Sequence, residues 1–413
     1  MTAKQAILCT DPGKVVLDMI RLIRRILPCL LALALLLPGN ARAVESPVEL
    51  SEEPPEEPLE ERPAEDLEIS AASAIVIEAD TGTILYERLP DLRMLIASTT
   101  KIMTALVILE SCALDETVTI TEAQAEVEGS SMELEAGEIY TVEELLYGLM
   151  LSSGNDAATA LAEHCAGSMD AFADLMNRKA AEIGLRNTHF RNAHGLDAEG
   201  HYSCARDLAL LTAEAMKNPE FCRFFSTQQQ TVHERELYNH NQLLWKLDGC
   251  IGGKTGYTNA AGRILVSVTE REGMRLICVT LCAPDDWNDH MALMETLFSQ
   301  WRLVRLPQDR WDRVEALSGT RDYVRLRCAV PALVIPKDGE LTWKLRLPRF
   351  VFAPVLLGER AGSVELFLDG EPLQTVEVVY AETVSRAPSV ALSAWERFQR
   401  SWLMPGRTYE WTK

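Results

Sequence analysis

The spacing of hydrophobic and polar positions changes along the chain, and each spacing predicts a type of element. Residues 73–78 and 83–87 are mainly apolar and flank a turn at residues 79–82, which predicts a β-hairpin. The continuous apolar run at residues 102–109 predicts a buried helix directly after this hairpin.

Apolar positions recur every three or four residues through most of the region 142–247, which predicts a helical block. The expected helices cover residues 142–151, 156–164, 169–183 and 207–216, the last of them ending near Pro219. Strands at 263–269 and 275–282 and a helix at 291–301 follow. This order predicts an α+β fold, in which the first and last strands meet in one antiparallel sheet and the helices pack on it. We assign residues 71–306 to this domain.

A different pattern begins after residue 306. Short strand-like runs occupy residues 323–328, 333–335, 341–347, 364–368 and 374–379. Asp369 and Gly370, between the last two runs, form a typical hairpin turn sequence. Residues 307–386 are therefore expected to form a small C-terminal β-sandwich domain, in which no cluster of catalytic residue types is visible.

The C-terminal tail, residues 387–413, has helical spacing. The apolar side chains that would share one helix face are Leu392, Trp395, Phe398, Trp402 and Leu403. Aromatic residues on an amphipathic helix suit the lipid interface, so we expect this tail to associate with a membrane surface. The alternative is a helix that docks on the β-domain.

The N-terminal segment, residues 1–43, resembles a signal peptide. Arginines at positions 21, 24 and 25 precede an apolar core at residues 26–37, and Ala41-Arg42-Ala43 provides a small-x-small cleavage site. Met19 lies just ahead of the arginines and is an alternative start. A short membrane anchor is the competing interpretation. We expect cleavage before Val44, export, and a location at the extracytoplasmic face of the cytoplasmic membrane or in the cell wall.

Charge is unevenly distributed in this chain of 413 residues with a formal net charge of −21. Residues 44–70 are rich in Glu and Pro and poor in bulky apolar side chains, so we expect a disordered, self-repelling linker there. The negative charge argues against nucleic acid as a partner.

Of the 10 cysteines, Cys9 and Cys29 lie in the segment expected to be removed, and the remaining eight show no paired short spacings. Export permits disulfides, but the sequence does not define their connectivity, and free thiols are the alternative.

Three short motifs carry candidate chemistry. Ser98 and Lys101 are three residues apart at the start of the expected helix, so they share a face of that helix. A serine becomes a nucleophile when a neighbouring base takes its proton, and a desolvated lysine can be that base. By itself this pair is weak, because a helix cap and a solvated lysine would produce the same spacing.

The second motif, Ser153-Gly154-Asn155, lies at a break between two expected helices, where a hydroxyl and an amide can both point into a cleft. The third, Lys254-Thr255-Gly256, lies just before the expected strand at residues 263–269. A cation and a hydroxyl suit a substrate carboxylate, and a glycine allows a substrate backbone to approach closely. The glycine that a nucleotide-binding loop needs further upstream is missing.

These three motifs, in this order, resemble the S-x-x-K, S-x-N and K-T-G motifs of penicillin-binding proteins and class A β-lactamases. Finer matches point to the serine-type D-alanyl-D-alanine carboxypeptidases of low molecular mass. They lie at residues 97–104, 153–157, 194–201 and 253–258. The resemblance is strong over residues 71–306 and implies the penicillin-binding-protein and β-lactamase-like transpeptidase fold. The proline often found before the first motif is replaced by Met94-Leu95-Ile96.

The resemblance also implies a reaction. Ser98 would attack the carbonyl between two terminal D-alanines of a peptidoglycan stem, with Lys101 taking its proton and Ser153 relaying a proton to the leaving amine. The acyl-enzyme would then be hydrolysed by water. β-Lactam antibiotics would acylate the same serine, and no cofactor is implied.

The resemblance assigns the remaining site residues to binding. Lys254 and Thr255 would bind the terminal carboxylate next to Gly256. Asn155 would hold a substrate amide group or orient the lysine of the first motif. The backbone N–H groups of Ser98 and Tyr257 would form the oxyanion hole.

Other interpretations make different predictions. His189, His194, Asp197 and His201 lie close together in the sequence, but they lack the helical H-E-x-x-H spacing of a zinc peptidase. We expect no metal there, because the resemblance makes residues 194–197 a structural loop. A β-lactamase would need a deacylating base, and no Glu-containing loop of the class A type is evident. A non-catalytic penicillin-sensing or wall-binding protein would not need intact motifs.

Overall fold

The computed structural model describes residues 67–306, 312–328 and 332–388, together with the backbone of a strand at residues 407–412. The expected signal peptide, most of the linker and the apolar face expected in the tail lie outside these residues. Within the described parts of the chain, none of the helices has both the length and the apolar character needed to cross a membrane.

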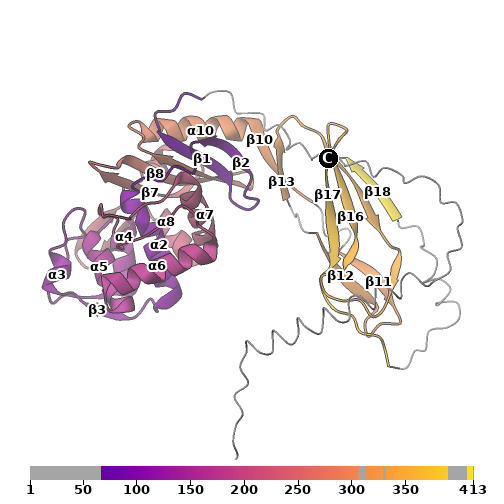
Figure 1. The fold of residues 1–413 in the computed structure, drawn as a ribbon, viewed down its shortest axis with the longest axis horizontal. Coiled ribbons are helices and arrows are strands. Elements are labelled where there is room, and N and C mark those ends of the chain that lie inside the picture. Colours follow the sequence, from indigo (N-terminus) through magenta and orange to yellow (C-terminus); the bar gives the residue numbers. More distant parts are fainter. Residues whose placement is uncertain (1–66, 307–311, 329–331, 389–406, 413) are drawn as a thin grey trace, which may run out of the picture. The chain divides into compact units, whose positions relative to one another are not determined.

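A five-stranded antiparallel sheet is the centre of the first part of the chain (Figure 1). Its strand order is β2-β1-β9-β8-β7. The strands are β1 Ser73–Glu78, β2 Ile84–Arg88, β7 Cys250–Thr258, β8 Gly262–Arg271 and β9 Met274–Leu281. The pairing of β1 with β9 joins the two ends of this region, as the sequence predicts, and leaves β7 at one edge of the sheet.

Alternate residues of the strands supply the two faces of the sheet. Ile75 and Ile77 pack with the larger helical group, whereas Ala74 and Val76 pack with the last helix of this region, α10. The helices of the larger group are α2 Lys101–Ser111, α4 Val142–Met150, α5 Asn155–Ala166, α6 Met169–Ile183, α7 Ala205–Ala215 and α8 Pro219–Ser226. Helix α10, Asp286–Gln300, covers the other face. The fold is therefore α+β with a helical block on an antiparallel sheet.

Short elements complete this region. They are the hairpin of β3 Thr117–Thr119 and β4 Ile139–Thr141, helix α3 Glu122–Ala125, the hairpin of β5 Gln229–Val232 and β6 Arg235–Tyr238, and helix α9 Leu243–Lys246.

Two features of the helical block differ from the sequence prediction. Pro219 begins helix α8 rather than only ending the preceding one, because proline suits the first helical position and the Asn218 side chain caps it. The β5–β6 hairpin interrupts the block after α8, and its polar residues gave no apolar alternation by which to recognise strands.

The C-terminal region is a β-domain with its own apolar core. Seven strands follow the order β15-β11-β12-β17-β16-β14-β18, and a separate pair joins β10 to β13. The strands are β10 Trp301–Arg305, β11 Arg313–Leu317, β12 Tyr323–Cys328, β13 Ala332–Pro336, β14 Leu341–Leu347, β15 Phe350–Phe352, β16 Arg360–Leu368, β17 Glu371–Tyr380 and β18 Arg407–Thr412. Asp369 and Gly370 both have positive φ, as a tight hairpin between β16 and β17 requires.

The end of the chain corrects one expectation. The sequence predicts an amphipathic membrane-associating tail over residues 387–413, but Arg407–Thr412 form β18, which pairs with β14, so the prediction is wrong for these last residues. The sequence of this strand alternates polar residues with Tyr409 and Trp411, a period of two that favours a strand over a helix.

Candidate active site

Ser98 lies in a single 3₁₀ turn, Ala97–Thr100, that leads directly into α2. The sequence predicts an N-cap or first-turn position, and the structure gives Ser98 no capping role. Ala97 has a φ of 43°, which bends the chain sharply before the serine. The turn places the Oγ of Ser98 3.0 Å from the Nζ of Lys101, so the two residues of the first motif are in direct contact.

Lys101 is completely buried, and polar partners surround its amine. Besides Ser98, its Nζ contacts the Oδ1 of Asn155 at 2.7 Å and the carbonyl oxygen of His194 at 2.7 Å. Burial, followed by the nearby charge of Lys254, holds the pKa of Lys101 well below its usual value of 10.5. A neutral lysine amine in this position can accept the proton of the serine hydroxyl.

Ser153 occupies the break between α4 and α5 and has a φ of 58°. The serine, and not the glycine that follows it, adopts the left-handed conformation. Gly154 is required for space instead, because a Cβ there would lie 2.6 Å from the Oδ1 of Asp156. The buried Asp156 accepts hydrogen bonds from the backbone of Met132 and Leu134, which fixes the loop beside this break.

Asn155 begins α5 and is almost completely buried. Its Oδ1 faces Lys101, and its Nδ2 donates to the carbonyl oxygen of Glu128 at 2.7 Å. Both ends of the amide are therefore engaged within the protein. Of the two roles expected for this side chain, this geometry favours orientation of Lys101.

Lys254, on the edge strand β7, extends toward Ser153. Its Nζ donates to the Oγ of Ser153 at 2.9 Å and to the carbonyl oxygen of Thr255 at 3.0 Å. Burial lowers the pKa of Lys254 to about 7. The lysine is thus poised between its charged and neutral forms near neutral pH, with its charge directed at Ser153.

Glycines allow the strand β7 and a neighbouring loop to approach the serine turn. A Cβ on Gly256 would lie 3.2 Å from the backbone N of Ser98, and a Cβ on Gly195 would lie 1.9 Å from the carbonyl oxygen of Ala97. Only glycine leaves enough room at the second position. The close approach places Gly256 beside the backbone N of Ser98.

A cleft of about 550 Å³ opens at this centre, and Ser98, Ser153, Thr255, Gly256 and Tyr257 all line it. The buried amines of the two lysines lie behind this lining.

The cleft also contains residues that the sequence analysis missed. Ser130, His240, Arg263 and Trp287 line it. Arg263 is paired across the β7–β8 hairpin with Tyr257, so the register of that hairpin was a usable signal. Burial and the charges of Lys254 and Lys101 lower the pKa of His240. No sequence pattern links Ser130, His240 or Trp287 to the three motifs.

The histidine-containing segment is held by separate contacts. His201 Nε2 hydrogen-bonds the hydroxyl of Thr100 at 2.8 Å, and His189 Nδ1 contacts the carbonyl oxygen of Gly200 at 2.8 Å. The His194 backbone faces Lys101, and Asp197 accepts a hydrogen bond from Thr258 at 3.0 Å. This loop therefore stabilises the serine turn through Thr100 and β7 through Thr258.

Comparisons with known proteins agree with this arrangement. The family model described as D-alanyl-D-alanine carboxypeptidase matches residues 59–285. The D-alanyl-D-alanine carboxypeptidase DacF of Bacillus subtilis is 33% identical over 351 residues, covering 79% of this chain and 90% of the relative. DacC of Escherichia coli, described in the same words, is 32% identical over 75% of this chain and 83% of the relative.

A solved structure extends the similarity to the fold. Penicillin binding protein 5 from Haemophilus influenzae superimposes with a TM-score of 0.67 and 29% identity, covering 78% of this chain and 99% of that protein. The sheet, the helical block and the three motifs thus define a penicillin-binding-protein fold with a serine-centred site. More specifically, the chain belongs to the family of serine-type D-alanyl-D-alanine carboxypeptidases. It is a hydrolase of the peptidase class.

Proposed function

We propose that this protein removes the terminal D-alanine from peptidoglycan stem peptides through an acyl-enzyme on Ser98. The observation that carries the proposal is the 3.0 Å contact between the Oγ of Ser98 and the Nζ of Lys101, a buried lysine with a lowered pKa. The family membership identifies the substrate class, and this contact supplies the nucleophile and its base.

In the acylation step, the neutral amine of Lys101 takes the hydroxyl proton as the Oγ of Ser98 bonds to the carbonyl carbon of the penultimate D-alanine. The carbonyl oxygen becomes an oxyanion, which accepts hydrogen bonds from the backbone N–H groups of Ser98 and Tyr257. The strand β7 approaches the serine turn closely enough at Gly256 to support this pairing. Removing a single donor of this type typically costs about 100- to 1000-fold in rate.

The amine of the departing D-alanine needs a proton when the peptide bond breaks. The hydroxyl of Ser153 is in the cleft, and Lys254 donates to it at 2.9 Å. We assign Ser153 as the relay that passes a proton to the leaving amine, with Lys254 keeping the relay supplied. The proton that Lys101 took from Ser98 passes to the Ser153–Lys254 relay and replaces the one given to the leaving amine, so Lys101 is neutral again. Lys101 then takes a proton from the water that attacks the ester carbonyl, and passes it to the Oγ of Ser98 as the ester bond breaks, which restores the free enzyme.

The terminal carboxylate of the substrate requires positive charge in the cleft. The hydroxyl of Thr255 and the guanidinium of Arg263 both line the cleft, whereas the Lys254 amine lies behind Ser153. Arg263 is anchored by Asp286 at 2.7 Å. We propose that Thr255 and Arg263 contact the carboxylate directly. Lys254 would contribute its positive charge from behind Ser153, without contacting the carboxylate.

Because β-lactams carry a strained amide and a carboxylate, they should acylate Ser98 by the same steps. The proposal also includes export by the N-terminal segment and action on the cell-wall side of the membrane. Residues 71–306 would be the catalytic domain, and residues 307–386 would be a separate β-domain. The apolar face at residues 392–403 would associate with the membrane surface, and vesicle flotation of the protein with and without residues 389–406 tests this.

The decisive experiment measures D-alanine release from a peptide that ends in D-Ala-D-Ala. The unmutated protein should release D-alanine, and Ser98→Ala should lose at least about 1000-fold in rate, because the nucleophile is removed. The matched control is Ser226→Ala, an exposed serine of α8.

The result that would overturn the proposal is release that persists in Ser98→Ala. Mass spectrometry after incubation with penicillin should locate the adduct on Ser98. Fast turnover of nitrocefin by the unmutated protein would instead indicate a β-lactamase.

A further inference from the structure

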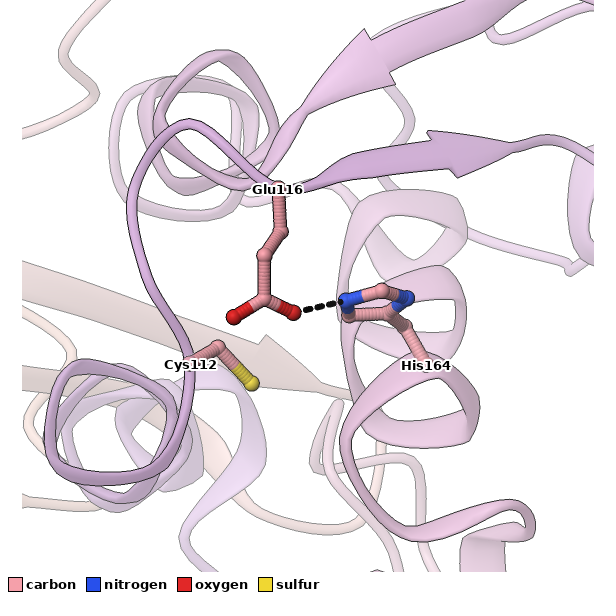
Figure 2. Close-up of side chains that lie close together, drawn as sticks. All are labelled: Cys112, Glu116 and His164. Atoms are coloured by element: carbon pink, nitrogen blue, oxygen red, sulfur yellow. Dashed lines mark hydrogen bonds and ion pairs between the residues drawn. The ribbon is translucent and has the colours of Figure 1, made fainter.

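Three potential metal ligands converge at a point that the acyl-transfer chemistry does not use. Cys112 is the C-cap residue of α2, Glu116 lies in the loop before β3, and His164 is in the last turn of α5. The donor atoms of these three side chains all lie within 4.8 Å of one another. Figure 2 shows these three side chains close together, with a contact drawn between the Glu116 carboxylate and the His164 imidazole.

The ligand types are those of a zinc site. Thiolate, imidazole and carboxylate bind Zn²⁺ at about 2.0–2.3 Å, so ligand atoms in a tetrahedral site lie roughly 3.3–3.8 Å apart. The Oε2 of Glu116 and the Nε2 of His164 are 2.9 Å apart, which is a hydrogen-bond distance and shorter than the separation in a tetrahedral site. An ion would take the place of this hydrogen bond, with the two atoms moving slightly apart and the thiol moving closer by about 1 Å. Cys112 and His164 are half-buried, so the site is accessible to an ion from solvent.

A further thiol lies next to the cluster. Burial and the neighbouring Cys165 raise the pKa of Cys112 to about 12. A neutral thiol is therefore favoured in the absence of an ion, and a bound cation would displace its proton. Cys165 follows His164 on α5 and interacts with the Cys112 thiol, so it is an additional soft ligand beside the cluster.

The helix ends add an electrostatic reason for a cation here. Helices α2 and α5 both end at the cluster, and the C-terminal end of a helix carries partial negative charge that favours a cation. Glu116 is held in place by a hydrogen bond to its Oε1 from the backbone N–H of Ala113 at 2.6 Å.

We propose that Cys112, Glu116 and His164 bind one divalent cation of the borderline-soft class represented by Zn²⁺. The same two helices begin at Lys101 and Asn155, roughly 14–16 Å away along the helix axes. The ion would join the far ends of the helices whose first residues are in contact at the active site. Its role would be structural, because neither the nucleophile nor the oxyanion donors reach it.

The test begins with the protein purified without chelators. Its metal content should be about one zinc ion per chain, and a chelated sample should regain one equivalent when Zn²⁺ alone is added. Added Co²⁺ should give the thiolate-to-cobalt charge-transfer absorption. Zinc at about one hundred times its dissociation constant should raise the melting temperature by roughly 5–10 °C.

Cys112→Ser and His164→Gln should each reduce bound zinc by at least about tenfold, since outright loss of a ligand exceeds the effect of disturbing its support. Cys222→Ser is the matched control, because Cys222 is also a half-buried free thiol but lies on α8, away from the cluster. The control should bind one equivalent. Circular dichroism checks that each variant is folded. The cobalt absorption is measured on the unmutated protein, so it tests the proposal even if a variant fails to fold.

Three results would overturn the proposal. One is an unmutated protein that binds neither zinc nor cobalt. Another is zinc that remains bound in both ligand variants, which would show an adventitious ion only. The third is a Cys112–Cys165 disulfide without metal in the purified protein, detected by thiol alkylation and mass spectrometry. D-alanine release is measured in parallel and should persist in the chelated protein, so failure of this site is distinguishable from failure of the serine chemistry.

Discussion

Lys254 and Ser153 are in direct contact, with 2.9 Å between the lysine Nζ and the serine Oγ, although they are 101 residues apart in the sequence. The contact joins the edge strand β7 to the break between α4 and α5. It parallels the 3.0 Å contact between Lys101 and Ser98. The site therefore contains two serine–lysine pairs, and we propose that the protonation states of the two lysines govern acylation.

A first prediction concerns the pH dependence of acylation by penicillin. The rate constant kcat/KM should rise with pH as Lys101 loses its proton and becomes a base. It should fall again near pH 7, where Lys254, with a pKa of about 7, loses the charge that supports Ser153. His240 also lines the cleft, but its pKa is lowered, so its titration lies on the acid side of this descending limb.

Lys254→Arg tests the assignment of the descending limb. Arginine remains charged throughout this range, so the limb should move to higher pH by at least about one unit even if the maximum rate falls. Lys217→Arg, at an exposed lysine, should leave the profile unchanged. A descending limb that does not move in Lys254→Arg would remove Lys254 from this role.

Asn155→Ala separates two roles for the amide. If Asn155 orients Lys101 through the 2.7 Å contact, kcat for D-alanine release should fall about 10- to 100-fold with little change in KM. A side chain that binds substrate would instead raise KM when it is removed. Asn288→Ala, on the exposed side of α10, is the control and should retain normal kinetics.

Arg263→Gln should weaken recognition of the substrate carboxylate. Loss of the guanidinium should raise KM about tenfold or more for a peptide with a free C-terminal carboxylate, because charge-assisted hydrogen bonds are the stronger ones. The comparison substrate is the same peptide with a C-terminal amide, for which the variant and the unmutated protein should differ little. An equal effect on both peptides would show that Arg263 acts only through its ion pair with Asp286.

The buried His290 should contribute to denaturation of the protein by acid. It is fully buried between the hydroxyls of Ser267 and Thr280, and burial lowers its pKa to about 3. Between about pH 6.5 and this value the unfolded chain binds one proton more than the folded chain, so the free energy of unfolding falls as pH falls. The contribution is about 1.4 kcal/mol per pH unit.

His290→Gln should therefore flatten the pH dependence of unfolding by about this amount between pH 6 and pH 4, as measured by urea denaturation. The variant is expected to be less stable at pH 7, but the slope is the informative quantity. His233→Gln, at an exposed histidine, provides the control. An unchanged slope in His290→Gln would mean that other groups account for the acid sensitivity.

The sequence allowed most of the catalytic scaffold to be predicted, because its sheet and helices follow simple apolar spacing. Helix α6 agrees with the expectation at both ends, Met169 and Ile183, where a serine cap and a glycine mark the boundaries. The pairing of β1 with β9 followed from the order of the elements. The β5–β6 hairpin could not be predicted, because its register depends on polar residues and tertiary contacts.

The candidate site, like the fold, could be predicted from the sequence only in part. Motif spacing identified Ser98, Lys101, Ser153, Asn155 and Lys254, which the structure brings together. Their individual conformations depend on long-range packing, as at Ser153, where the positive φ has no sequence signal. His240 follows β6 and Trp287 follows β9, and the tertiary fold brings both to the cleft although neither lies in a motif.

The central sheet joins segments that are far apart in the sequence. Glu78 on β1 and Arg275 on β9 are hydrogen-bonded across 197 residues of sequence, and β9 is the strand that links β1 to β8. A growing chain that has not yet produced β9 cannot close this sheet, and β7 then has no fixed position opposite the serine turn. Non-local pairing of this kind forms late because loop closure must precede it. Ser98 therefore precedes in the sequence the strands that complete its sheet, and a chain truncated before β9 lacks the strand that links β1 to β8.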